Sequence, residues 1–418
     1  MKRARCLHLV WFLPCLASLA CSTPEPAKTG TCNAALAPAV RRLSAAELDA
    51  AATPVLGTSA QLSSKLPPDT RQFDFSRNVA QTVDPVTLRT LYDATRDASA
   101  ALDLRAAPFP SCAANAAVTD VACAASVVQA LARQAFRHTP SAAELAPLNA
   151  LFAVGADGAD FRSGVALVVR ALLASPKFLY ATALGDGTNA GRVSLSDDEL
   201  ATELALLISG QPPDDELLAA AGQGDLRLGD QREAQAIRLL QQPQSRFLYQ
   251  RFVAEWFGLV RLDSLAKSST VVTNFPALRQ AMLDENSAFV DDVMSAEGGS
   301  LAALLAGGYS IVPPELAGLY GIAPTAPGAR VALDQVGRVG ILQQGAFLSA
   351  FAHEAESAPV LRGKAVLERL LCATLPKPTN LKVDIVPPAP DPNATTRERY
   401  AKHATDPVCS SCHDYLDG

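Results

Sequence analysis

Apolar side chains recur every three or four positions along most of the chain, which is the spacing of one face of an α-helix. The clearest run falls within 161–180 and consists of Val165, Val168, Val169, Leu172 and Leu173. The same period predicts helices over four further stretches: 231–257, with a break at Pro243, 276–294, 338–350 and 359–372. Alternating patterns typical of strands are scarce. The sequence therefore predicts a mainly α, multi-helix body.

Three further helices are predicted from capping boxes at their starts. In this motif a serine side chain accepts a hydrogen bond from the backbone three residues further on, and a glutamate at that position binds back to the serine backbone. The pairs are Ser44 with Glu47, Ser141 with Glu144, and Ser196 with Glu199. We therefore expect a helix to begin directly after each serine.

One linker is evident from its prolines. Six of them fall within 376–392: Pro376, Pro378, Pro387, Pro388, Pro390 and Pro392. Such a segment is extended and builds no core of its own. It separates the helical body from a short terminal piece, 393–418.

The N-terminus has the layout of a bacterial export signal. Three basic residues among the first five precede an apolar stretch that ends at Ala20 and is too short to span a bilayer comfortably. The small residue before Cys21 is similar to a lipobox, in which the cysteine carries lipid. We predict a signal peptide over 1–20, lipid on Cys21 and a tether over 21–40, hence an outer-membrane lipoprotein. Ordinary cleavage after Ala20, giving a periplasmic protein without lipid, is the alternative.

The composition narrows the class of protein. With 418 residues, 49% of them apolar and 19% charged, the chain can bury a core in two or three domains. A formal net charge of −6 argues against nucleic acid as a partner. No long apolar run follows the signal, which excludes a multi-span membrane protein. We therefore expect membrane contact through the lipid anchor only.

The exported compartment favours disulfides, because thiols oxidise there. Cys112 and Cys123 bracket a ten-residue, alanine-rich segment and are predicted to pair. Cys32 and Cys372 are the two cysteines that then remain for a second bond. Alternatively, Cys372 is a buried free thiol, because leucines precede it.

The sharpest motif is the run CSSCH, formed by Cys409, Cys412 and His413 with two serines between the cysteines. Two thiols at this spacing reach both vinyl groups of one haem, and the histidine that follows presents its imidazole to the iron. We predict haem c on Cys409 and Cys412, with His413 as the proximal ligand. The alternatives are a redox dithiol, a structural disulfide, or half of a zinc site with His403 nearby.

The sixth iron ligand is less evident. Met282 and Met294 lie in a predicted amphipathic helix and are interpreted as core residues. His403 reaches the iron only if the chain loops over the opposite haem face. The printed sequence ends five residues after His413, so we expect an incomplete cytochrome c-like segment over 393–418.

One predicted helix carries two pairs of carboxylates. The four residues, spaced seven apart, are Asp284, Glu285, Asp291 and Asp292. We interpret them as a solvated acidic face. Paired carboxylates for acid–base chemistry, as in a hydrolase, are the alternative.

Several strings resemble one family of large secreted proteins. In the C-terminal part they are Arg338-x-Gly340-Ile341-Leu342, Ser357-x-Pro359-Val360-x-Arg362-Gly363-Lys364, Pro376-x-Pro378-x-Asn380, His403 and the CSSCH run. Earlier strings include Arg41-Arg42-Leu43-x-x-x-Glu47, Ala135-Phe136-Arg137, Ser175-Pro176-x-Phe178-Leu179-Tyr180 and Leu316-Ala317-x-x-Tyr320-Gly321. These are similar to the planctomycete-type cytochrome-like proteins built from the domain-of-unknown-function series fifteen-eighty-seven, fifteen-ninety-five, fifteen-ninety-two and fifteen-eighty-eight.

The resemblance covers about 36–418 and implies a module order. Its parts are an N-terminal helical module over 41–118, a second over 119–185, a third over 194–325, a fourth with its helical part over 331–375, the linker 376–392 and the haem-attachment segment 393–418. Glu203 departs from the family, which usually has arginine there.

These observations lead to one expected function and two alternatives. We expect an exported haem-binding protein that transfers electrons to or from a redox partner protein. A helical cell-surface binding or scaffold protein, for polysaccharide handling and with a structural CSSCH run, is the first alternative. A hydrolase that uses the acidic helix is the second.

Overall fold

The computed structural model describes residues 39–185, 194–296, 298–373, 391, 393–405 and 416. We call 39–240 the N-terminal lobe. Its elements are β1 (Ala39–Arg42), α1 (Ala45–Leu56), α2 (Pro85–Ala100), α3 (Val121–Phe136), α4 (Ala142–Ala156), α5 (Phe161–Leu173), α6 (Pro176–Leu179), β2 (Tyr180–Ala183), α7 (Asp197–Ile208), α8 (Asp215–Gln223) and α9 (Gly229–Leu240).

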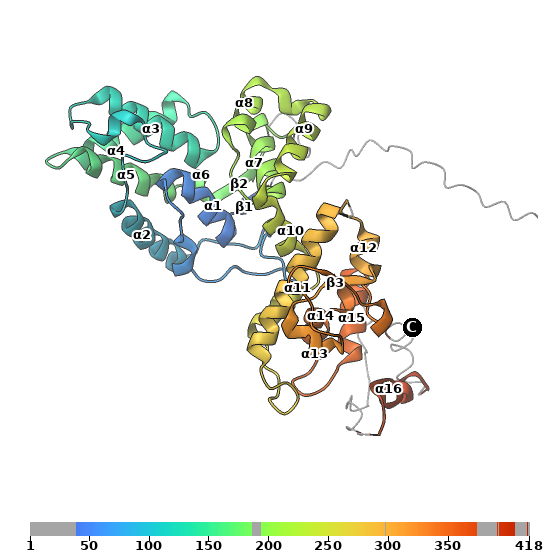
Figure 1. The fold of residues 1–418 in the computed structure, drawn as a ribbon. Coiled ribbons are helices and arrows are strands. Elements are labelled where there is room, and N and C mark those ends of the chain that lie inside the picture. The colour runs from blue at the N-terminus through green and yellow to red at the C-terminus, as the bar shows by residue number, and fades with distance from the viewer. Residues whose placement is uncertain are drawn as a thin grey trace, which may run out of the picture.

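We call 243–373 the C-terminal lobe. Its elements are α10 (Pro243–Trp256), α11 (Phe275–Ala296), α12 (Leu301–Ala306), β3 (Tyr309–Ile311), α13 (Ala317–Tyr320), β4 (Arg330–Ala332), α14 (Gly345–Ala350) and α15 (Pro359–Arg369). The last helix, α16 (Thr396–Thr405), follows the proline-rich segment. In Figure 1, α10 is the helix of the C-terminal lobe that lies next to the N-terminal lobe. The predicted mainly α fold is confirmed.

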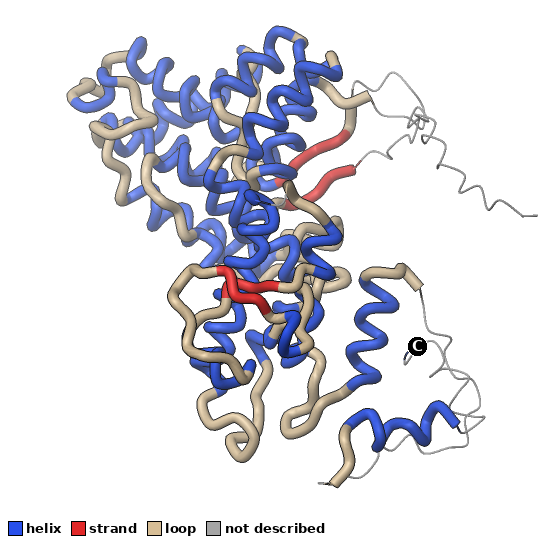
Figure 2. The backbone as a smooth tube through the Cα atoms, turned by 45° about the vertical axis from the view of Figure 1, so that its right-hand side comes forward, coloured by secondary structure: helices blue, strands red, loops and turns tan. Residues whose placement is uncertain are grey.

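Within the described residues the strands are short and form two small sheets, drawn in red in Figure 2. β1 pairs antiparallel with β2, with Ala39 opposite Ala183. β3 pairs antiparallel with β4, with Tyr309 opposite Ala332. The β1–β2 sheet therefore places the start of the N-terminal lobe beside the strand that follows α6.

The three predicted capping boxes are confirmed at the starts of α1, α4 and α7. In each, the serine accepts from the backbone of the glutamate and the glutamate accepts from the serine backbone. The predicted break at Pro243 is confirmed as well, since α9 ends at Leu240 and Pro243 opens α10. Proline suits the first position of a helix because a backbone N–H group, which proline lacks, would have no hydrogen-bond acceptor within the helix there.

Other predicted helix ends are wrong. The run over 161–180 stops at Leu173, because Pro176 disfavours helical backbone in the residue before it and opens α6 instead. The helix expected over 338–350 is shortened to a 3-10 turn, Ile341–Gln343, followed by α14. The helix expected over 359–372 ends at Arg369. The run over 276–294 is confirmed within α11.

The buried apolar side chains that the structure describes form three clusters. The largest fills the N-terminal lobe between α1 and α5, with Val127, Leu131 and Val168 fully buried. A small cluster lies between α7, α8 and α9. The third fills the C-terminal lobe around Phe257 and Phe289. No helix in the described parts of the chain combines the length and apolar character needed to cross a membrane.

The cysteines follow the sequence prediction in part. Cys112 and Cys123 form a disulfide with their Cα atoms 5.9 Å apart, which ties the start of α3 to the loop before it. Cys372 is exposed, so its interpretation as a buried thiol is wrong. The other cysteine proposed as its partner, Cys32, lies outside the described residues, as does Cys21.

Candidate functional site

The residues predicted to hold haem lie at the C-terminal end of the chain. Cys409, Cys412 and His413 are outside the described residues. His403 belongs to α16, and its side chain is outside the described part as well. Of the two methionines, Met282 is buried in the core as expected, whereas Met294 is 39% exposed. The described residues nearest to the motif are those of α16 and Leu416.

Both flanks of the motif contact the C-terminal lobe. On its N-terminal side, α16 is held to the loop before α15 by two contacts. Arg399 pairs with Glu356 at 2.9 Å, and the hydroxyl groups of Ser357 and Thr396 lie 3.0 Å apart. On its C-terminal side, Leu416 lies against Gly363 in α15. A Cβ atom added at Gly363 would come within 2.6 Å of the Leu416 carbonyl oxygen, so this contact requires glycine.

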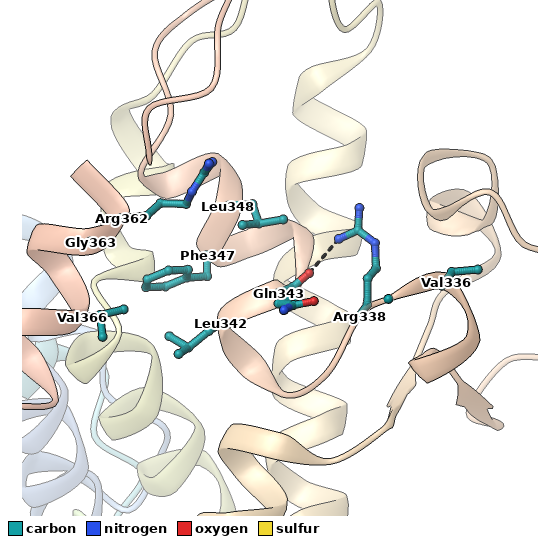
Figure 3. Close-up of a pocket in the computed structure, with 10 residues that line it drawn as sticks. Val336, Arg338, Leu342, Gln343, Phe347, Leu348, Arg362, Gly363 and Val366 are labelled. Atoms are coloured by element: carbon teal, nitrogen blue, oxygen red, sulfur yellow. Dashed lines mark hydrogen bonds between the residues drawn. The ribbon is translucent and has the colours of Figure 1, made fainter. Parts of the chain in front are cut away.

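A pocket of about 550 Å³ opens beside this contact. Its walls come from the loop before α14, from α14 itself and from α15. Figure 3 shows Leu342, Phe347 and Val366 gathered on its apolar side. The same figure shows the guanidinium groups of Arg338 and Arg362 on one rim, on either side of Leu348. The pocket thus combines an apolar wall with two positive charges.

A buried carboxylate lies behind this pocket. Glu285 is fully buried in α11, and Ser310 donates a hydrogen bond to it over 2.8 Å. Tyr320 donates a second hydrogen bond to the same carboxylate. Burial raises the pKa of Glu285 to about 7, against the lowering effects of these two hydrogen bonds and of the positive charge of Arg338. The interpretation of Glu285 as part of a solvated acidic face is therefore wrong.

Tyr320 connects the buried carboxylate to the pocket. Its hydroxyl group accepts a hydrogen bond from the Gly345 amide at 2.7 Å. The Arg338 guanidinium carbon lies 4.3 Å from the centre of its ring, a cation–π contact. Arg338 also donates to the Gln343 carbonyl at 2.7 Å, the dashed line in Figure 3. Two contacts therefore fix the orientation of this arginine at the pocket rim.

A second, larger cavity of about 820 Å³ lies between the lobes. Its lining is mostly apolar and includes Phe252 and Trp256 of α10 and Leu304 of α12. Tyr249 also lines it, and among the described residues the buried Tyr249 hydroxyl has no hydrogen-bond partner. No motif of the sequence analysis pointed to this cavity.

Ion pairs around Glu47, a residue of the first family string, stabilise the N-terminal lobe. Arg41 makes a bidentate ion pair with Glu47, with distances of 2.6 and 3.0 Å. Arg77 lies 3.4 Å from Glu47 and 3.0 Å from Glu203. Glu203, where the family usually has arginine, therefore has a cation of its own in this chain.

The two strings of the second module contact one another. Arg137 is buried with a positive φ of 60°, and it donates to the carbonyl groups of Lys177, Phe178 and Tyr180. This arginine links the C-terminal end of α3 to the junction of α6 and β2.

A scan against family models matches three domains along the chain. PSD5, a protein of unknown function (DUF1595), matches residues 123–182; PSD4 (DUF1592) matches 195–322; and PSCyt3 (DUF1588) matches 338–418. Searches of curated proteins and of solved structures found no match. The likeness of 41–118 to the first module of the series stays a prediction. The three domains, in this order, show that the chain belongs to the planctomycete-type series that its sequence strings resemble.

Proposed function

We propose that the chain is a c-type haem protein that transfers single electrons outside the cytoplasm. The observation that carries this proposal is the CSSCH run inside the match to PSCyt3, a domain whose short name suggests a cytochrome-like role. The thiols of Cys409 and Cys412 would each add across one haem vinyl group, forming a C–S bond while the hydrogen passes to the neighbouring carbon. His413 would supply the imidazole ligand to the iron.

The pocket beside Gly363 offers an apolar side to such a group. Its volume of about 550 Å³ is within the range of ordinary cofactor sites. Leu342, Phe347 and Val366 form its apolar side. When bound, the haem would supply a one-electron change at its iron, and the residues of this chain would hold and shield it.

We expect covalent haem to be lost completely when both cysteines of the motif are replaced. The full chain would be produced with its export signal in a bacterium that matures c-type cytochromes. Haem staining after denaturing electrophoresis, with intact mass, should show bound haem in the wild type and none in the Cys409→Ser/Cys412→Ser variant, because each thioether needs its thiol. Cys372→Ser is the matched control and should keep its haem, since Cys372 is an exposed thiol outside the motif. A bare polypeptide mass for the wild type would contradict the proposal and favour the scaffold alternative.

We also propose that the protein is anchored through lipid on Cys21. The support is the basic start, the short apolar stretch and the small residue before this cysteine. Labelling of growing cells with a radioactive fatty acid should mark the wild type, and Cys21→Ser should abolish the label and move the protein from the membrane to the soluble fraction. Cys15→Ser, inside the signal, is the control and should remain labelled. An unlabelled, soluble wild type would refute the anchor.

A further inference from the structure

The cavity between the two lobes has an aromatic wall. Phe252 and Trp256 of α10 lie with their ring centres 5.9 Å apart. The ring of Phe75, from the loop before α2, stacks on Phe252 at 5.8 Å. Rings at this spacing present flat apolar faces and polarised edges, against which a further ring packs well. The rest of the lining is largely aliphatic and includes Leu207 of α7 and Leu304 of α12. The lining therefore favours a ligand with a planar ring and an aliphatic part.

Apolar side chains around this cavity remain exposed to solvent. Leu207, Phe247 and Leu301 all line it, and each is more than half exposed. Single exposed apolar side chains are ordinary at protein surfaces, but a group of them around one cavity is typical of a ligand-binding site. A bound apolar molecule would remove these side chains from water, which is favourable in proportion to the area that it covers.

The charged groups of the lining are paired with one another. Arg77 lies 3.4 Å from Glu47, and Arg251 lies 3.3 Å from Glu255. These four are the charged residues of the described lining. A charged ligand would lose its hydration here without gaining an unpaired counter-ion. We therefore expect the ligand to be uncharged.

Tyr249 adds a polar requirement. It lines the cavity, and its hydroxyl oxygen is buried without a hydrogen-bond partner among the described residues. Burial raises the pKa of the Tyr249 hydroxyl group, which therefore stays protonated at neutral pH and remains a donor. A buried donor without an acceptor is unfavourable, and a ligand oxygen that accepts from it would remove this cost. A carbonyl or ether oxygen meets this requirement without bringing a charge.

We propose that the cavity between the lobes binds an uncharged organic ligand that has a planar ring, a carbonyl or ether oxygen and an aliphatic part. The ring would pack against Phe252 and Trp256, and the aliphatic part would contact Leu207 and Leu304. The ligand oxygen would accept a hydrogen bond from Tyr249. The inference does not depend on the proposed function, because none of these residues belongs to the predicted haem site.

Three related probes test the ligand class. Hexanophenone has a phenyl ring, a carbonyl group and a pentyl chain, hexylbenzene lacks the carbonyl oxygen, and 4-hexylbenzoate carries a negative charge. Isothermal titration calorimetry on the full chain should give a dissociation constant of about 100 µM or lower for hexanophenone. Binding of 4-hexylbenzoate should be at least about tenfold weaker, because its charge finds no free counter-ion. Equal or tighter binding of 4-hexylbenzoate would overturn the assignment of an uncharged ligand.

Single substitutions test the assigned contacts. Tyr249→Phe should weaken the binding of hexanophenone about fivefold and leave that of hexylbenzene unchanged, because only the ketone accepts a hydrogen bond. Phe252→Ala should weaken the binding of both probes by at least about fivefold, since it removes the central ring of the aromatic wall. Phe73→Ala is the matched control, because Phe73 is exposed and outside the cavity lining, and both probes should bind this variant as they bind the wild type.

Tryptophan fluorescence locates the bound probe. The chain has two tryptophans, so Trp11→Phe leaves Trp256 in the cavity wall as the single reporter. Hexanophenone should quench Trp256 over the same concentration range in which calorimetry detects binding. Circular dichroism checks that each variant folds, and Phe252→Leu replaces Phe252→Ala if the alanine variant does not. A chain that binds no hexanophenone, or binding that Tyr249→Phe or the Phe252 variant leaves unchanged, would overturn the inference.

Discussion

Gly340→Ala is expected to destabilise the C-terminal lobe by about 4 kcal/mol, enough to consume much of the stability of an ordinary domain. Gly340 has φ 58° and ψ −177°, a backbone conformation open essentially to glycine alone. A Cβ atom there would lie 2.1 Å from the Leu305 carbonyl oxygen, which belongs to the backbone of α12. Neither backbone can yield without moving α12 away from the loop. Urea unfolding followed by circular dichroism measures the loss.

Gly337 provides a matched control three residues earlier. It also has a positive φ, 72°, but no atom lies within 4 Å of the position its Cβ would take. Gly337→Ala should therefore cost only about 1 kcal/mol, the strain of the left-handed backbone alone. If both variants unfold at the same urea concentration, the close approach of Gly340 to α12 is not a feature of the folded protein.

Short-range signals in the sequence predicted the helix starts well. A capping box needs only two side chains three residues apart, so Ser44 with Glu47 can be recognised without knowledge of the fold. The same holds for Pro243, whose effect on the helix is local. The helix expected over 338–350 is wrong because its beginning is decided by a non-local contact, that of Gly340 with Leu305.

The buried Glu285 carboxylate likewise depends on contacts between residues that are far apart in the sequence. Charge alone placed Glu285 on a solvated face, although Met282 and Phe289 lie three or four positions away and mark the core face of α11. The helical spacing of Met282, Glu285 and Phe289 favours burial of Glu285, whereas the neighbouring acidic residues favour a solvated face. The hydrogen-bond donors that make burial tolerable, Ser310 and Tyr320, are 25 and 35 residues away, and no local pattern connects them.

One part of the candidate site can be predicted from the sequence, and the other part cannot. The attachment motif can be recognised from five consecutive residues, because its chemistry depends on spacing. The pocket beside Gly363 cannot, because its lining residues Leu342, Phe347 and Val366 come from the loop before α14, from α14 and from α15. Gly363 belongs to one of the strings that resemble the family. Only the structure explains why this position is a glycine: a side chain there would collide with the backbone of Leu416.

Glu285→Gln is expected to remove a pH dependence of stability between about pH 4.5 and 7. Burial raises the pKa of Glu285 from 4.5 to about 7 in the folded protein. Across this window the folded state keeps a proton that the unfolded state has lost, so stability falls as the pH rises, by about 3 kcal/mol in total. The glutamine side chain has nearly the same shape and does not titrate.

The variant should therefore be no less stable than the wild type at pH 8, where the wild type holds a buried charge. Urea midpoints measured from pH 4.5 to 8 would show the difference in slope. Asp284→Asn is the matched control, since this exposed carboxylate is the preceding residue on the same helix and its removal should leave the slope intact. Parallel curves for wild type and Glu285→Gln would mean that Glu285 titrates alike in the folded and unfolded chain. Its burial between Ser310 and Tyr320 would then have no electrostatic cost, contrary to the geometry of the site.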